Sequence, residues 1–134
     1  MDRVFLDANV LFSAAYRDHS ALARLWALPD TALVTSQYAV EEARRNLEIP
    51  EQRSRLAQLI GDMQIVPDED VVGLEIVGVD LPVKDWPILW AAIVVQATHL
   101  LTGDLRHFGQ YFGQSICGVN VMRPADYLRE KGVR

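Results

Sequence analysis

The sequence predicts an α/β domain of the three-layer α/β/α type, with helices on both faces of a mainly parallel central sheet. Short apolar runs of the strand type alternate with helical segments along the chain. Right-handed crossovers between such strands make the sheet mainly parallel. The length of 134 residues, with no internal repeat and no linker rich in glycine and serine, indicates a single domain over residues 1–134.

The first half of the chain supplies three strands and four helices to this prediction. Short apolar runs bounded by polar residues or proline predict strands over residues 3–7, 32–35 and 64–67. Apolar residues at helical spacing predict helices over residues 9–16, 21–28, 37–48 and 50–62. Pro29 stops the second of these helices, and Ser36 can cap the third. In the fourth, Leu56, Leu59 and Ile60 share one face, which we expect to be buried.

The second half of the chain is built around an apolar helix predicted over residues 85–98. This helix is apolar on almost every side, so other elements must cover it, and Pro87 fits only in its first turn. The remaining predicted elements are a helix over residues 70–80, a strand over 99–102, a turn at 103–104, an aromatic-rich loop, a strand over 119–122 and a helix over 124–131. Gly132 is expected to terminate the last helix.

Composition and charge exclude several classes of protein. Of all residues, 50% are apolar and 23% are charged, which argues against a disordered chain. No apolar stretch approaches the roughly 20 residues of a membrane span, and the start of the chain lacks the pattern of a secretory signal. The single cysteine, Cys117, cannot form an internal disulfide, so we expect a cytoplasmic protein. The net charge of -5 speaks against a passive nucleic-acid binder.

Four acidic residues are predicted to meet at one edge of the sheet. Asp7 ends the first strand, and Asp104 follows the strand over residues 99–102 with one residue between. Ser36 follows the second strand, and Glu42 lies six residues further along, in the next helix. Asp85 opens the apolar helix that leads back to the strand before Asp104. Because the ligand crevice of such a sheet lies beyond the carboxyl ends of its strands, we expect the four carboxylates to converge there.

Each acid also has a purely structural explanation. Asp7 and Asp85 suit helix caps, Asp104 suits an Asx turn, and Glu42 beside Glu41 suits a solvated helix face. As a group, however, four acids in one cleft repel one another unless a cation neutralises them. Hard divalent cations prefer oxygen ligands, so the expected metal is Mg²⁺ or Mn²⁺. Zinc is not expected, because the three histidines and the single cysteine have no zinc-ligand spacing.

These residues lie in segments that resemble a known family, the PIN domain. The resemblance is strongest to the VapC-like ribonucleases, which are the toxin components of toxin–antitoxin systems. It rests on residues 4–11, 36–42, 84–92 and 100–108, and residues 119–128 resemble the final strand and helix of the family. The ordered set is specific, although each segment alone is weak. The resemblance implies the PIN fold over nearly the whole chain.

The resemblance also implies an activity, which is metal-dependent hydrolysis of RNA by an endoribonuclease with Mg²⁺ or Mn²⁺ as cofactor. The four acids match the acidic positions of the family, with Glu42 favoured over Glu41, and Glu42 either binds metal or orients the attacking water. Asn9 and Thr102 match polar residues that accompany these acids in the family. Thr102 and Ser36 are expected to position carboxylates. Arg44, Arg45 and Arg106 follow two of the acids and are candidates to contact RNA phosphates, with a solvated helix face as the alternative for the first two. In relatives, basic residues near this cleft also receive the antitoxin.

The chain departs from the family at one place. Many relatives carry a further acid two or three residues after the position of Asp104, where this chain has Leu105, Arg106 and His107. A second metal is therefore expected to bind weakly or only with substrate. For His107 we favour an exposed loop residue over a phosphate contact.

Other functions remain open from the sequence. The first is a PIN-like module that binds RNA or a partner without cleaving RNA. A haloacid dehalogenase phosphatase needs a second aspartate two residues after the nucleophile, where this chain has Asn9, and a receiver domain needs an acidic pair before its first helix. Because relatives commonly form dimers, we also expect a homodimer. Trp86 and Trp90 lie on the apolar helix, either in the core or in the dimer interface.

Overall fold

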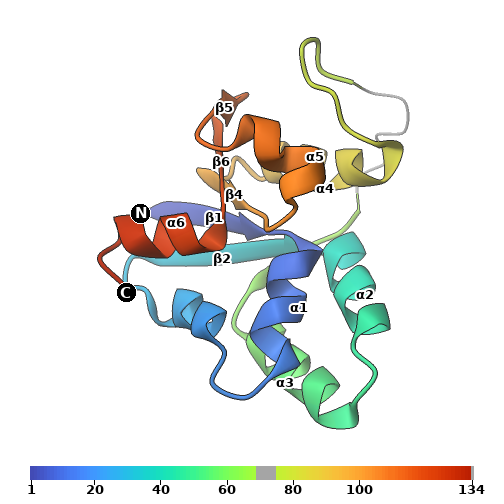
Figure 1. Cartoon of the computed structure of the whole chain (residues 1–134), viewed down its shortest axis with the longest axis vertical. Helices are drawn as coiled ribbons and strands as arrows, with labels where there is room; N and C mark the ends of the chain where they lie inside the picture. The colour runs from blue at the N-terminus through green and yellow to red at the C-terminus, as the bar shows by residue number, and fades with distance from the viewer. Residues whose placement is uncertain (69–74, 134) are drawn as a thin grey trace.

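The computed structural model describes residues 1–68 and 75–133, and a six-stranded sheet lies at its centre (Figure 1). The strand order is β3-β2-β1-β4-β6-β5. The strands of this part of the chain pair in parallel, except that β5 and β6 form an antiparallel hairpin. The strands are β1 (Asp2–Leu6), β2 (Thr31–Ser36), β3 (Gln64–Val66), β4 (His99–Leu101), β5 (Ser115–Ile116) and β6 (Val119–Met122). The predicted three-layer α/β class is confirmed.

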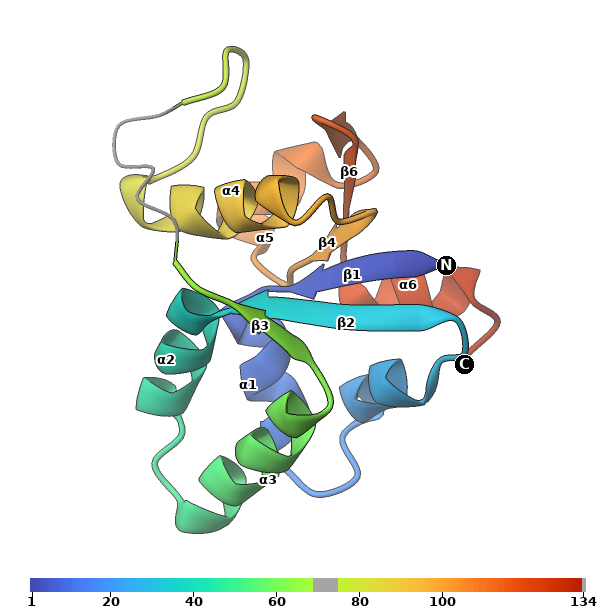
Figure 2. The same ribbon diagram turned by 180° about the vertical axis from the view of Figure 1, so that it is seen from behind.

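Helices cover both faces of the sheet (Figures 1 and 2). One face carries α1 (Ala8–Tyr16), α2 (Gln37–Asn46) and α3 (Pro50–Gly61), and α1 packs against the other two. The other face carries α4 (Trp86–Val94) and α5 (Leu105–Phe108). The 3-10 helix η1 (Ala21–Ala27) packs against α1 and against the last helix, α6 (Pro124–Glu130). This division follows from right-handed crossovers, because the chain builds the sheet in one direction through α1 to α3 and in the opposite direction through α4 and α5.

The direction of the chain reverses at β1, which lies between β2 and β4. Leu6 pairs with Leu101 in the parallel register of β1 and β4, so the residues that follow these two strands emerge side by side. The backbone N–H of Asp7 continues the ladder and donates to the carbonyl of Leu101 at 3.0 Å. A strand-order reversal of this kind opens a crevice at the carboxyl ends of the strands. The fold therefore places Asp7 and Thr102 at the edge where sheets of this kind bind ligands.

The core is formed by the central strands and the apolar helix α4. Val4, Phe5 and Leu6 of β1 are fully buried, as are Leu100 and Leu101 of β4. The prediction that other elements cover α4 is confirmed, since this helix packs against α2, β2 and β4. Its tryptophans lie in or against this core: Trp86 is buried, with its indole N–H donating to the carbonyl of Leu81 at 3.1 Å, and Trp90 is half-buried.

Two predicted helices differ from the structure. The helix predicted over residues 85–98 is shorter, because Gln96 adopts a left-handed backbone (φ 55°) and ends it, and Asp85 belongs to the preceding 3-10 turn η2 (Val83–Asp85). The helix predicted over residues 70–80 is wrong for residues 75–80, where Gly78 (φ 84°) forms a turn closed by the Val79 N–H donating to the Ile76 carbonyl. Residues 70–74 of that prediction lie outside the described residues.

The aromatic-rich loop predicted after residue 104 is also wrong, because it contains α5, the 3-10 helix η3 (Gly109–Tyr111) and β5. The sequence signal was the aromatic residues themselves, because the structure buries Phe108 fully and Tyr111 almost fully. Aromatic side chains anchor this segment to the core, which leaves little room for an irregular loop. Within the described ranges, none of the helices has the length and apolar character needed to cross a membrane.

Candidate metal and active site

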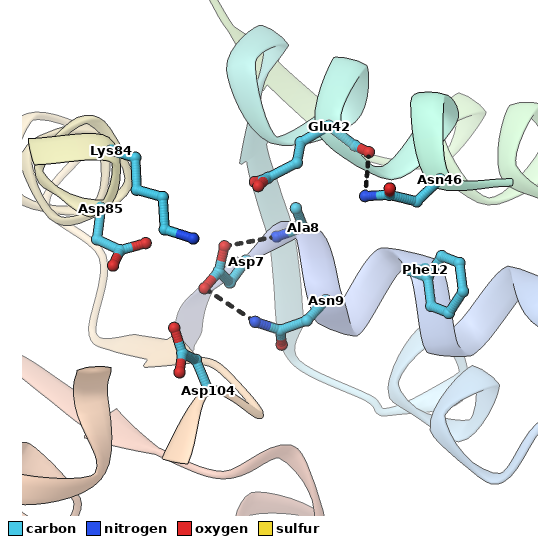
Figure 3. A pocket seen from close by; sticks show the side chains of 9 residues that line it. All are labelled: Asp7, Ala8, Asn9, Phe12, Glu42, Asn46, Lys84, Asp85 and Asp104. Carbon is cyan, nitrogen blue, oxygen red and sulfur yellow. Dashed lines mark hydrogen bonds between the residues drawn. The ribbon is translucent and has the colours of Figure 1, made fainter. Parts of the chain in front are cut away.

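Asp7 is the central acid of the candidate site and is held by three hydrogen bonds. It caps α1, with Oδ1 accepting from the Ala8 N–H at 2.7 Å. Its Oδ2 accepts from the hydroxyl of Thr102 at 2.8 Å and from the amide of Asn9 at 3.1 Å. The residue is 5% exposed. The carboxylate is thus buried, and its direction is fixed from both sides of the strand-order reversal. Figure 3 shows its bonds from Ala8 and Asn9.

Asn9 and Thr102 join the end of β1 to the end of β4. The side-chain carbonyl of Asn9 accepts from the Gly103 N–H at 2.7 Å, while the Thr102 hydroxyl oxygen accepts from the Asp104 N–H at 3.1 Å. A Cβ atom at Gly103 would lie 3.3 Å from the side-chain carbonyl oxygen of Asn9, a tight contact that favours a small residue at this turn. Both polar residues therefore position Asp7 and Asp104 relative to each other.

The four predicted acids line one pocket of about 390 Å³. Figure 3 shows their side chains directed into it from separate elements: Asp7 from the end of β1, Glu42 from α2, Asp85 from η2 and Asp104 from the start of α5. Ser36 lies outside the lining, buried at the end of β2. Its hydroxyl oxygen accepts from the Ala39 N–H at 3.2 Å and caps α2, so Ser36 acts on the site through the helix that carries Glu42.

His107 lies against two of the acids. Its Nδ1 is 2.8 Å from Oδ2 of Asp85 and 3.0 Å from Oδ2 of Asp104. The preference for an exposed loop residue is wrong, because the side chain is 22% exposed and stands on α5. The sequence signal for a position of His107 near the acids was its spacing of three residues after Asp104. Asp104 caps α5 by accepting from the His107 N–H at 3.0 Å, which brings the imidazole back toward the cap.

The ligand atoms of Asp85, Asp104 and His107 all lie within 4.8 Å of one another, a spacing that suits one metal ion. Oδ2 of Asp85 and Nδ1 of His107 are both buried, and in the described part of the chain neither has a hydrogen-bond partner. Buried polar atoms without partners destabilise a folded protein. A divalent cation would satisfy both atoms, so the residues present fit a metal at this position.

Burial and like charge act on the acids in the same direction. Burial raises the pKa of Asp7 to about 6, with the charges of Glu42 and Asp85 adding to the effect and the bonds from Thr102 and the Ala8 N–H opposing it. Burial also raises the pKa of Asp85, with Asp104 adding and His107 opposing. The metal-free site therefore resists full ionisation, whereas a cation in the pocket would favour it.

The basic residues divide between the pocket and its surroundings. Lys84, which sequence reasoning did not single out, lines the pocket next to Asp85. Arg44 and Arg45 are exposed on α2, and Arg44 forms an ion pair with Glu41. Arg106 is exposed on α5 and lines a neighbouring hollow of about 320 Å³ together with His107. None of the three predicted arginines lines the acidic pocket.

Comparison with solved structures matches this fold to toxin–antitoxin proteins. One match is a chain in the crystal structure of VapBC2 from Rickettsia felis bound to a DNA fragment from the VapBC2 promoter. It superposes with a TM-score of 0.60 at 15% identity and covers 90% of this chain and 98% of that one. Another match is VapC20 of Mycobacterium tuberculosis, a toxin that cleaves the sarcin–ricin loop. It superposes with a TM-score of 0.56 at 14% identity and covers 75% of this chain and 91% of that one. The chain has a VapC-like PIN fold.

At these identities the likeness establishes the fold alone. No protein-family model matches the sequence, and the search of curated proteins found no match. Within the PIN fold, the acidic pocket occupies the strand-order reversal between β1 and β4. The chemistry of this chain must therefore be argued from its own side chains.

The raised pKa of Asp7 predicts a pH-dependent stability that Asp7→Asn removes. Below about pH 4, Asp7 is protonated in both the folded and the unfolded protein, so its raised pKa does not lower the free energy of unfolding. Above about pH 7 it is ionised in both states, and the full cost of the buried charge is present. In chelator, the unfolding free energy of the wild type should fall by about 3 kcal/mol relative to Asp7→Asn over this range, the equivalent of a shift of about two pKa units. Denaturant titrations at several pH values measure the difference. Parallel pH profiles of the two proteins would contradict a raised pKa at Asp7.

Replacing Asp85 should stabilise the metal-free protein. Asp85→Asn removes the cost of burying a charge and relieves repulsion with Asp104, which together outweigh the lost attraction to His107. We expect its melting temperature in chelator at neutral pH to rise by about 3 °C, which corresponds to about 1 kcal/mol for a domain of this size. Asp62→Asn, at the exposed end of α3, is the matched control and should leave the melting temperature unchanged. A lower melting temperature for Asp85→Asn would indicate a structural cap.

Proposed function

We propose that the protein is a metal-dependent endoribonuclease that acts as the toxin of a toxin–antitoxin pair. The observation that carries the proposal is the convergence of four carboxylates on one pocket, with His107 lying against two of them. Folding alone does not favour such an arrangement, whereas binding of a cation does. The PIN fold supports the proposal, because VapC20, which shares it, cleaves RNA at the sarcin–ricin loop.

Asp7, Asp85 and Asp104 would hold Mg²⁺ or Mn²⁺, with Glu42 as a further ligand or as the group that orients the attacking water. When bound, the cation lowers the pKa of water and offsets negative charge on the reacting phosphate. Asn9 and Thr102 keep the carboxylate of Asp7 directed into the pocket through the bonds to its Oδ2. Glu42 enters from α2 on another side of the pocket, which suits a group that receives a proton from the attacking water (Figure 3).

Positive charge around the pocket would bind the RNA backbone. Lys84 lines the pocket and can contact the phosphate that reacts. Arg44, Arg45 and Arg106 lie outside the lining, where they can contact flanking phosphates and guide a negatively charged strand toward an acidic site. The same basic residues can bind an antitoxin segment. The likeness to VapBC2 supports an antitoxin partner, while a cytoplasmic location and a homodimer stay predictions.

Cleavage of RNA by variants of the acids tests this function. The wild type should cleave total cellular RNA and a sarcin–ricin stem–loop in Mg²⁺ or Mn²⁺ and lose this activity in chelator. Asp7→Asn and Asp104→Asn should each lower the rate by about 100-fold or more, because each removes charge that the cation needs. Rates come from gel-resolved cleavage of end-labelled RNA.

The matched control is Asp62→Asn, which makes the same chemical change on an exposed helix end and should cleave like the wild type. Circular dichroism establishes that each variant is folded. Cleavage that persists in chelator, or in folded Asp7→Asn, would overturn the mechanism. RNA binding by the wild type without cleavage in either metal would favour the binding module over the enzyme.

A further inference from the structure

We propose that His107 is a metal ligand, and that its nitrogen makes this site prefer a first-row transition ion such as Mn²⁺ to Mg²⁺. The inference rests on the proposed function insofar as both place a cation in the acidic pocket. It goes further by assigning a ligand that the four acids do not include and by naming the class of metal. Three features of the cluster support this role: the spacing of the ligand atoms, their burial and the way α5 fixes the imidazole.

The spacing matches the edge of a coordination shell. In an octahedral site with metal–ligand distances of about 2.1 Å, neighbouring ligand atoms lie about 3 Å apart. Nδ1 of His107 is 2.8 Å from Oδ2 of Asp85 and 3.0 Å from Oδ2 of Asp104. Nδ1 of His107 therefore lies as close to each acid as neighbouring ligands of one ion, and all three ligand atoms lie within 4.8 Å of one another.

Burial gives an independent observation. Asp85 is 8% exposed, and its Oδ2, like Nδ1 of His107, has no hydrogen-bond partner within the described ranges. The two atoms are close but are not aligned for a hydrogen bond with each other. A cation shared between these two buried atoms would satisfy both of them.

The fold selects His107 from the residues that follow Asp104. Leu105 is 70% exposed and Arg106 is also exposed, so neither faces the pocket. His107 instead lies against Asp85 and Asp104, because its backbone N–H donates to the Asp104 carboxylate at the helix start and fully buried Phe108 anchors the next position. The imidazole is thus positioned before any metal binds.

The chemistry of this donor set determines the preference. Mg²⁺ binds oxygen ligands and retains water, whereas imidazole suits first-row transition ions. A site that combines these carboxylates with one imidazole should therefore favour Mn²⁺. Changing the nitrogen ligand to a carboxylate should move the preference back toward Mg²⁺ without removing the site.

Electron spin-echo spectroscopy of Mn²⁺ bound to the full chain tests the proposal without any activity assay. The wild type should show modulation from a directly bound ¹⁴N, and His107→Asp should lose it while still binding Mn²⁺. Calorimetric titrations should show that the ratio of the Mg²⁺ and Mn²⁺ dissociation constants falls by about tenfold or more in His107→Asp. His19→Asn, at an exposed position, is the matched control and should retain the ¹⁴N signal.

The outcomes separate the two proposals. Saturable Mn²⁺ binding without ¹⁴N modulation, or an unchanged metal preference in folded His107→Asp, would overturn the role of His107 and leave the nuclease proposal standing. Absence of saturable binding of either ion would contradict both. Loss of RNA cleavage in Asp7→Asn together with a retained ¹⁴N signal would support both.

Discussion

The parallel pairing of β1 with β4 brings like charges together at one point, and the rest of the site depends on that constraint. Leu6 is paired with Leu101, so the chain leaves both strands side by side, with Asp7 on one and Asp104 close after the other. Glu42 and Asp85 then reach the same pocket from helical segments on opposite faces of the sheet. A protein with this topology must either disperse these charges or neutralise them.

The hydrogen bonds around Asp7 hold the acids in place rather than neutralising them. Thr102, Asn9 and the Ala8 N–H satisfy its oxygens, yet burial still raises its pKa to about 6. The polar network therefore maintains a site whose charge is incompletely balanced by the protein. Such pre-organisation at the cost of stability is typical of sites that bind a charged ligand, and here it favours a cation.

Much of this arrangement can be predicted from sequence, because it follows from strand ends. Asp7, Asp85 and Asp104 adjoin the predicted strand ends or helix starts, and a parallel sheet brings such positions to one edge. His107 and Lys84 were harder to place, since their orientation depends on a capped short helix and a 3-10 turn that carry no strong periodicity. The turn at residues 75–80 was misjudged for a similar reason, because the left-handed backbone of Gly78 outweighs the apolar spacing around it.

The central claim is that these side chains form one cation site at the strand-order reversal. Anomalous diffraction from crystals of the protein soaked in Mn²⁺ tests it most directly. We expect a single strong anomalous peak in contact with Asp85, Asp104 and His107, in the pocket that Asp7 also lines. A pocket without a peak in crystals whose Mn²⁺ concentration saturates the protein in solution, or a strong peak only at exposed acids elsewhere, would contradict it.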